Sequence, residues 1–243
     1  MVRNMLILLV LLPAGVTAGT PDWTGYDQLL KEYVEPASKA GLDVNLVDYS
    51  GLRNDTRFEV LVDTIREFPV DRLENDNERL AFYINAYNIL TMRLILDHWP
   101  VDSIKDIGGF FSGPWDIVVL KNADSSLTLD NIEHDIIRSI PEPRIHFAVN
   151  CASLSCPDLR REAYRADRLH EQLEDQTRRF LRQDGKGLSV DGDRVKVSRI
   201  FDWYEEDFDR VGGVTKFVQR IRPDLEIEGV RAKLTYNWAL NGQ

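Results

Sequence analysis

The longest patterned segment of the chain is Asn77–Asp97, where apolar residues from Leu80 to Leu96 occupy nearly the whole circumference of a helix. Such a distribution is typical of a helix that is buried on all sides. Asn75 can cap this helix, and Glu78, three residues later, can complete a capping box. The pattern therefore predicts a central buried helix near residues 77–97.

The rest of the pattern predicts a helix-rich α+β fold. Apolar residues at helical spacing indicate further helices, and short apolar runs bounded by turn residues indicate strands. The pair Asp191-Gly192 between two such runs favours a hairpin. Because the strands pair through hairpins, we expect one domain with a small, mostly antiparallel sheet. The predicted helices are Trp23–Ser38, Arg57–Phe68, Asp130–Ile140, Asp167–Arg182 and Ser198–Val211; the predicted strands are Asp116–Leu120, Ser126–Leu129, Arg144–Asn150, Gly187–Val190 and Arg194–Val197, with Val44–Leu52 turn-like and a turn at Asn122–Ser125.

Residues 1–18 have the pattern of a secretory signal peptide. Arg3 precedes the apolar run Met5–Leu12, and Val16-Thr17-Ala18 supplies small residues before a cut ahead of Gly19. This apolar run is too short to span a bilayer as a helix. We therefore expect a secreted or periplasmic protein in which residues 19–243 form a single domain, with no stable membrane insertion after cleavage.

The charge of the chain narrows the classes of partner. The 243 residues carry a formal net charge of −10, and no basic stripe offsets it. Since an acidic protein repels phosphate backbones, we expect no nucleic-acid partner. The glycine- and aromatic-rich loop Gly108–Trp115 is not followed by a phosphate-binding helix, and no cofactor is indicated. The expected partner is a small-molecule or peptide-like ligand of the cell envelope.

The first candidate for a chemical site is Arg144–Pro157, which holds both cysteines and His146 and ends in a loop of small residues. Cys151 is the candidate nucleophile, and a thiol needs a base or a positive neighbour to become a thiolate near neutral pH. Five residues of extended chain span about 16 Å at ~3.3 Å each. His146 therefore reaches Cys151 only if the loop folds back over the strand.

His134, one short helix upstream, is the alternative base. Asp130 and Glu133 have the spacing of a capping box, which explains both carboxylates without a site, although Glu133 stays a candidate. In the predicted strand, Asn150 shares a face with His146 and the small Ala148, so this face borders either a cleft or a closely packed helix. Asn150 can serve there as an oxyanion-type donor. The candidate catalytic residues are thus Cys151, His134, His146, Glu133 and Asn150.

Three further residues are candidate substrate contacts. Asn85 and Asn88 lie about 60° apart on one side of the central helix. Buried carboxamides must be hydrogen-bonded, so these two either tie down a neighbouring loop or contact a ligand. Trp115 closes the aromatic loop Phe110–Trp115, which can add to a ligand surface. The acidic cluster Glu205-Glu206-Asp207 is interpreted as a solvated helix face.

The two cysteines, Cys151 and Cys156, leave three alternatives open. Secreted chains with two cysteines commonly form a disulfide. A free catalytic thiol is the second alternative. The third is a zinc site in which Cys-x4-Cys is joined by His134 or His146, for which the spacing alone is weak support.

Several motifs together resemble domain-of-unknown-function family 547. The resemblance covers roughly residues 44–208 and implies that Asn85, Asn88, Glu133, His134 and His146 fall within family motifs. Some relatives are fused to glutaredoxin-like domains, which implies thiol chemistry by association only. The motifs are Val47-Asp48-Tyr49, Phe82-Tyr83-Ile84-Asn85-Ala86-Tyr87-Asn88, Asp106-Ile107-Gly108-Gly109, Leu127-Thr128-Leu129-Asp130-Asn131-Ile132-Glu133-His134, Arg144-Ile145-His146-Phe147-Ala148 and Asn150-Cys151-Ala152-Ser153.

Three functional hypotheses follow. The leading one is Cys/His acyl transfer or hydrolysis on a peptide-like or cell-envelope substrate, with Cys151 as nucleophile and His134 or His146 as general base. The alternative is a binding or interaction module in which a disulfide staples the loop and no catalysis occurs. The third is a zinc-dependent hydrolase.

Overall fold

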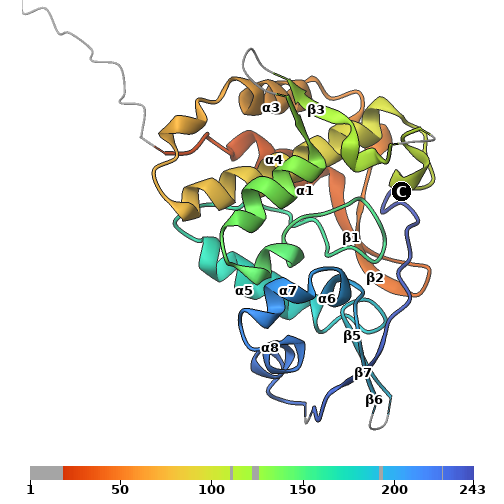
Figure 1. Ribbon diagram of the computed structural model, residues 1–243. Helices are drawn as coiled ribbons and strands as arrows, with labels where there is room; N and C mark the ends of the chain where they lie inside the picture. The colour runs from red at the N-terminus through yellow and green to blue at the C-terminus, as the bar shows by residue number, and fades with distance from the viewer. Residues whose placement is uncertain (1–18, 110–111, 122–125, 192–193, 226) are drawn as a thin grey trace, which may run out of the picture.

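Helix α4 (Asp76–Asp97) lies at the centre of the fold, as predicted (Figure 1). The side chain of Asn75 accepts a hydrogen bond from the N–H of Glu78 at 3.0 Å. The Glu78 carboxylate accepts from the N–H of Glu74 instead of returning to Asn75, so the predicted capping box is only half formed. Almost every side chain from Leu80 to Ile95 is buried, which fits a helix surrounded by other elements.

The computed structural model describes residues 19–109, 112–121, 126–191, 194–225 and 227–243. The predicted signal peptide at residues 1–18 lies outside the described residues. So do Phe110 and Phe111 of the aromatic loop, the predicted turn at Asn122–Ser125, and Gly192 of the predicted hairpin turn.

The strands form three separate small sheets, not one. Strands β1 and β2 pair antiparallel, as do β3 and β4, while β5 and β6 form an antiparallel hairpin to which β7 adds in parallel. The prediction of a helix-rich α+β domain with small, mostly antiparallel sheets is therefore confirmed. Within the described part of the chain, no helix is long and apolar enough to cross a membrane.

The first predicted helix, Trp23–Ser38, is longer than the observed helix α1 (Thr24–Tyr33). Helix α1 ends at Tyr33, and the chain continues as strand β1 (Val34–Lys39), which turns back into β2 (Leu42–Val47). Pro36 cannot donate to a helical hydrogen bond, and it fits an edge strand. Ala40 and Gly41 both have positive φ, 53° and 76°, as a two-residue hairpin turn requires.

The predicted strand Arg144–Asn150 is wrong, because this segment begins with the 3₁₀ helix η6 (Pro143–Phe147). Pro143 stands at the first helical position, where its fixed φ favours a helical turn. The Glu142 carboxylate caps that turn by accepting from the N–H of Arg144 at 3.1 Å. Turn hydrogen bonds then continue through Ala148 and Val149. As a result, His146 and Asn150 do not share the face of a strand.

Two other predicted helices are present but irregular. Asp130–Ile140 is a π-helical segment, η4 (Asn131–Ile136), followed by a 3₁₀ turn. Ser198–Val211 is broken at Tyr204 into two short helices, α6 and α7. Glu133 lies in the first of these segments and Asp207 in the second, and both side chains are buried.

The C-terminal segment joins two buried clusters. One cluster surrounds α4; the other is aromatic and contains Phe147, Phe201, Phe208 and Phe217. From β7 the chain runs along the side of the molecule towards β1 and β2 (Figure 1). It forms isolated bridges between Ser153 and Leu240 and between Val47 and Gly242. The elements are α1 Thr24–Tyr33, β1 Val34–Lys39, β2 Leu42–Val47, α2 Tyr49–Leu52, α3 Thr56–Glu67, η1 Val70–Arg72, α4 Asp76–Asp97, η2 Ile104–Asp106, η3 Pro114–Asp116, β3 Val118–Lys121, β4 Ser126–Thr128, η4 Asn131–Ile136, η5 Ile137–Ser139, η6 Pro143–Phe147, α5 Leu169–Phe180, β5 Leu188–Asp191, β6 Arg194–Val197, α6 Ile200–Trp203, α7 Glu205–Asp209, α8 Val214–Ile221 and β7 Val230–Lys233.

Candidate active site

The loop after η6 is fixed on both sides. From α4, the Asn88 carboxamide donates to the carbonyl of Ala148 at 3.0 Å and accepts from the N–H of Asn150 at 2.8 Å. From the C-terminal segment, the N–H of Asn241 donates to the carbonyl of Ala152. Ala152 itself has φ of +56°, a left-handed conformation that a non-glycine residue adopts only when its surroundings impose it. The loop that carries Cys151 is therefore held rigidly.

This loop borders a cavity of about 90 Å³ that brings together side chains from six parts of the chain. Glu133, His146 and Tyr87 form its buried part, being 5 %, 2 % and 1 % exposed. Cys151 is half-buried beside them. The cavity is lined by Tyr87, Trp115, Glu133, His146, Val149, Cys151, Cys156, Pro157, Ile200, Trp203, Tyr204, Tyr236 and Trp238.

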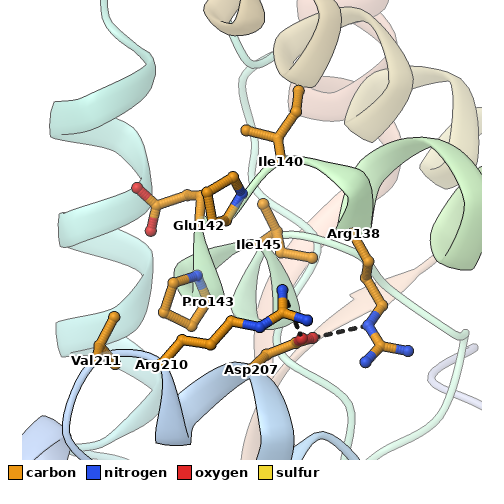
Figure 2. Close-up of a pocket in the computed structure, with 9 residues that line it drawn as sticks. Arg138, Ile140, Glu142, Pro143, Ile145, Asp207, Arg210 and Val211 are labelled. Atoms are coloured by element: carbon orange, nitrogen blue, oxygen red, sulfur yellow. Dashed lines mark hydrogen bonds and ion pairs between the residues drawn. The ribbon is translucent and has the colours of Figure 1, made fainter.

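His146 is paired with a carboxylate on α7. Its Nε2 lies 2.8 Å from Oδ2 of Asp207, and its ring stacks on Tyr204 with 3.9 Å between ring centroids. Asp207 also accepts from Nε of Arg138 at 2.7 Å and lies 3.7 Å from the Arg210 guanidinium (Figure 2). The sequence predicts a solvated position for Asp207. That prediction is wrong, because Asp207 is buried, with 8 % of its surface exposed.

The protonation of this pair follows from its surroundings. The hydrogen bond from His146, with those of Arg138, holds the pKa of Asp207 well below its usual range. Burial lowers the pKa of His146, with Asp207 opposing that effect. At neutral pH the histidine is accordingly neutral, and Nε2 carries the hydrogen because it faces a carboxylate acceptor. Its Nδ1 is buried without a hydrogen-bond partner among the described residues, and is left with a free lone pair.

The two thiols have different environments. Their sulfur atoms are 2.9 Å apart and both cysteines are free, since a disulfide has its sulfurs about 2.05 Å apart. The side-chain hydrogen bond with Cys156, together with those to the hydroxyls of Ser153 and Tyr236 at 3.3 Å each, lowers the pKa of Cys151 against the effect of burial. Burial raises the pKa of Cys156. Cys151 is therefore the thiol that ionises first.

Glu133 reaches the cavity from the π-helical segment η4. The extra residue per turn in such a segment re-aims side chains, and π-helical turns are frequent at functional sites. The hydroxyl of Tyr204 donates to Oε1 of Glu133 at 2.5 Å. Its neighbour His134 points elsewhere: it is exposed, and its Nδ1 accepts from Arg138 at 2.6 Å.

The positions of the predicted site residues correct two of the proposed roles. Cys151, His146, Glu133 and Trp115 line one cavity, whereas His134 lies outside it and cannot act as the base in this arrangement. Asn150 does not line the cavity either, because its amide donates to the carbonyl of Pro157 at 2.7 Å and its oxygen accepts from the N–H of Ala152 at 2.9 Å, which fixes the loop instead of supplying an oxyanion donor.

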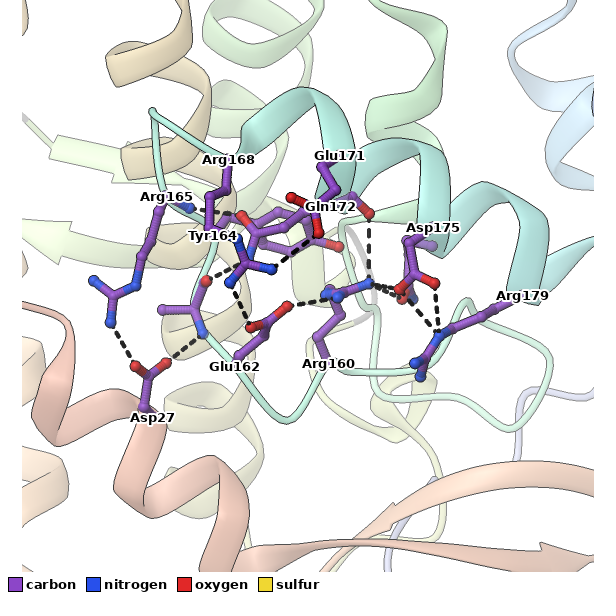
Figure 3. A network of polar contacts seen from close by, with 12 residues as sticks. Asp27, Arg160, Glu162, Tyr164, Arg165, Arg168, Glu171, Gln172, Asp175 and Arg179 are labelled. Carbon is purple, nitrogen blue, oxygen red and sulfur yellow. Dashed lines mark hydrogen bonds and ion pairs between the residues drawn. The ribbon is translucent and has the colours of Figure 1, made fainter.

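Asn85 and Asn88 bind backbone groups and do not line the cavity. Asn85 donates to the carbonyl of Tyr164 at 2.8 Å and accepts from its N–H at 2.9 Å, as Asn88 does for the cysteine loop. The segment around Tyr164 is in turn held on α5 by ion pairs of Arg160 and on α1 by Arg165 (Figure 3). Of the two alternatives for Asn85 and Asn88, these contacts fit the first, in which each carboxamide ties down a neighbouring loop and so acts as a structural clamp.

Sequence reasoning missed Asp207 and most of the aromatic residues that line the cavity, namely Tyr87, Trp203, Tyr204, Tyr236 and Trp238. Asp207 lies three residues after Tyr204, next to the apolar stripe Ile200–Tyr204–Phe208, and this register was the available signal for a buried position. Tyr236 and Trp238 belong to the run Leu234–Leu240, in which every second residue is apolar, and this period of two was the available signal for an extended segment with one buried face.

No zinc site is assembled from the candidate ligands. In the parts of the chain that the structure describes, no group of three or more His, Cys, Asp or Glu side chains is placed to hold a metal ion. Neither His134 nor His146 is hydrogen-bonded to a cysteine there, because His134 pairs with Arg138 and His146 with Asp207. The zinc hypothesis therefore receives no support from the geometry.

Comparison with known proteins identifies a matching family model but indicates no activity. Residues 70–181 match the model of a family described as "Protein of unknown function, DUF547". The matched stretch contains Glu133, His146 and Cys151, while Asp207 and Tyr236 lie outside it. No curated protein and no solved structure matches the chain.

Proposed function

The chain carries a domain of the DUF547 family, whose name assigns no activity, and from the geometry of the cavity we propose that it is a secreted or periplasmic cysteine-dependent acyltransferase or hydrolase. The observation that carries the proposal is a thiol of lowered pKa in the same small cavity as a neutral histidine with a free nitrogen. The substrate class remains the one expected from the sequence, a peptide-like or cell-envelope acyl compound.

In the proposed reaction Cys151 is the nucleophile and His146 transfers the protons. The Cys151 thiolate attacks a carbonyl carbon, forms a thioester and releases the leaving group, which takes up the thiol proton by way of His146. Water or a second acceptor then loses a proton to Nδ1 of His146 and breaks the thioester, and that proton returns to Cys151. Asp207 holds the histidine in the tautomer that leaves Nδ1 free, as the carboxylate of a triad does.

Acylation of Cys151 tests this proposal. We expect p-nitrophenyl acetate to acetylate the folded protein at Cys151, found by mass spectrometry of its peptides, with the acetyl group lost again over time. Cys151→Ser should abolish the modification, because a serine hydroxyl is not ionised there. Equal labelling of Cys151→Ser, or labelling of Cys156 instead, would contradict the proposal.

A second candidate, thiol–disulfide exchange, is favoured by one observation, the 2.9 Å between the two sulfurs. In this reaction Cys151 attacks a disulfide donor, one thiolate leaves, and Cys156 then displaces the second to close an intramolecular disulfide. The buried Cys156 has the position of a resolving thiol.

Cys156→Ser separates the two candidates. If acyl transfer is the function, this variant keeps acetylation at Cys151, because Cys156 takes no part in the thioester chemistry and the serine hydroxyl can still donate to the sulfur of Cys151. If exchange is the function, the variant treated with glutathione disulfide stops at a stable mixed disulfide on Cys151. Intact-mass measurement with both reagents reads out each result.

A further inference from the structure

The outer wall of the cavity is a cluster of aromatic rings. Tyr236 and Trp238 have centroids 4.6 Å apart, Trp203 lies 4.8 Å from Tyr236 and 5.6 Å from Trp238, and Trp115 lies 5.7 Å from Trp238. Trp203 is 42 % exposed, whereas Tyr204 and Tyr87 continue the wall inward. The faces of such rings attract cations, and several rings together recognise ammonium groups.

Three of these rings already have a cation on one face. Lys105 Nζ lies 4.8 Å from the centre of the Trp238 ring, the Arg199 guanidinium 6.0 Å from that of Trp203, and the Arg138 guanidinium 5.2 Å from that of Tyr204. None of the three lines the cavity. Among the described residues that line the cavity there is accordingly no lysine or arginine of the protein itself.

Glu133 makes the inner end of the cavity negative. Its side chain is buried, its only hydrogen bond among the described residues comes from Tyr204, and in the same part of the chain it forms no ion pair. The Arg138 guanidinium, which lies over the ring of Tyr204, is paired with Asp207 and His134. A buried carboxylate is costly without a positive partner, and a ligand can supply one.

We propose that this cavity binds the ammonium group of an organic cation, between the aromatic cluster and Glu133. Among the described residues no lysine or arginine lines it, so an anionic or neutral head group has nothing comparable to bind. Its volume of about 90 Å³ fits a small head group rather than a polymer. In so far as it concerns catalysis, the inference rests on the proposed function: the acyl substrate or acceptor would carry an ammonium group close to the reacting carbonyl.

Calorimetric titration of the full chain with small probes tests this site without any turnover. The probes are choline and n-butylammonium, with 3,3-dimethylbutan-1-ol and n-butanol as neutral counterparts of similar shape. We expect at least one ammonium probe to bind at least tenfold more tightly than its neutral counterpart. The choline and butylammonium arms then separate a quaternary from a primary ammonium group.

Two variants locate the site. Glu133→Gln keeps the shape and an acceptor for Tyr204 but removes the charge, and should weaken ammonium binding at least tenfold. Trp203→Leu, at an exposed ring, should weaken it several-fold. Glu206→Gln, the same charge change at an exposed position on α7, should leave binding unaltered.

Each outcome decides the inference. Equal binding of neutral and ammonium probes, unaltered binding by both Glu133→Gln and Trp203→Leu, or no binding of either cation would overturn it. Ammonium binding without acetylation of Cys151 would overturn the proposed function alone. Acetylation of Cys151 without ammonium binding would overturn the inference alone.

Discussion

Asp207→Asn is expected to slow acetylation of Cys151 and its reversal by at least about 100-fold, as loss of the orienting carboxylate does in a catalytic triad. An asparagine amide can donate to Nε2 of His146, which moves the ring hydrogen to Nδ1 and removes the free lone pair. The variant should also lower the free energy of unfolding by about 2–3 kcal/mol, because charge-assisted hydrogen bonds from Arg138 and His146 are lost.

The pH dependence of this stability difference has a defined sign. Since the pKa of Asp207 is lowered in the folded state, its stabilisation is complete above the unfolded-state value of about 3.9 and is lost as pH falls from there through the folded pKa. Chemical denaturation at several pH values should show wild type and Asp207→Asn converging below about pH 4. Glu206→Gln is the control on the same helix. Wild-type rates in Asp207→Asn would contradict the role assigned to His146.

Asn88→Ala is expected to cost about 3 kcal/mol of stability, because it leaves two buried backbone groups without partners, the carbonyl of Ala148 and the N–H of Asn150. The second group immediately precedes Cys151, so the loop that positions the thiol should loosen as well. Urea denaturation gives the stability, and the rate of Cys151 acetylation gives the effect on the loop.

Asn85→Ala is the matched control. It removes the same two kinds of hydrogen bond from the same helix, but those bonds hold Tyr164, away from the cavity. We expect a similar loss of stability with near wild-type acetylation. Equal loss of acetylation in both variants would mean that the clamp at Asn88 has no particular connection with the site.

The elements that sequence predicted best are those specified by local pattern. The periodicity of α4 and its cap at Asn75 are local properties, and both are present. The hairpin β5–β6 likewise follows from two short runs with a turn between them. The helix-rich α+β class followed from these elements without any knowledge of tertiary contacts.

The failures arose where turn chemistry or tertiary contacts compete with pattern. The alternation of Ile145, Phe147 and Val149 was interpreted as a strand, but Pro143 and the Glu142 cap start a helical turn there. That turn removes the separation of about 16 Å expected for extended chain, and His146 and Cys151 consequently reach one cavity.

Only part of the site could be predicted from the sequence, because tertiary contacts bring the other residues to the cavity. Cys151, His146, Glu133 and Trp115 were identified from residue type and local spacing. Asp207 and the aromatic residues Trp203, Tyr204, Tyr236 and Trp238 lie more than fifty residues after Cys151 in the sequence. Only the packing of α6, α7 and the C-terminal segment brings them to the cavity.

The most direct test of the account is the pH dependence of alkylation of Cys151 in the folded protein. Iodoacetamide labelling followed by peptide mass spectrometry gives the rate at each cysteine, and the rate follows the thiolate fraction. We predict a midpoint for Cys151 below the ordinary thiol pKa of about 8.5, with Cys156 labelled only at higher pH, and an upward shift of the Cys151 midpoint in Tyr236→Phe. An ordinary or raised midpoint at Cys151, or faster labelling of Cys156, would contradict the claim that Cys151 is the activated thiol.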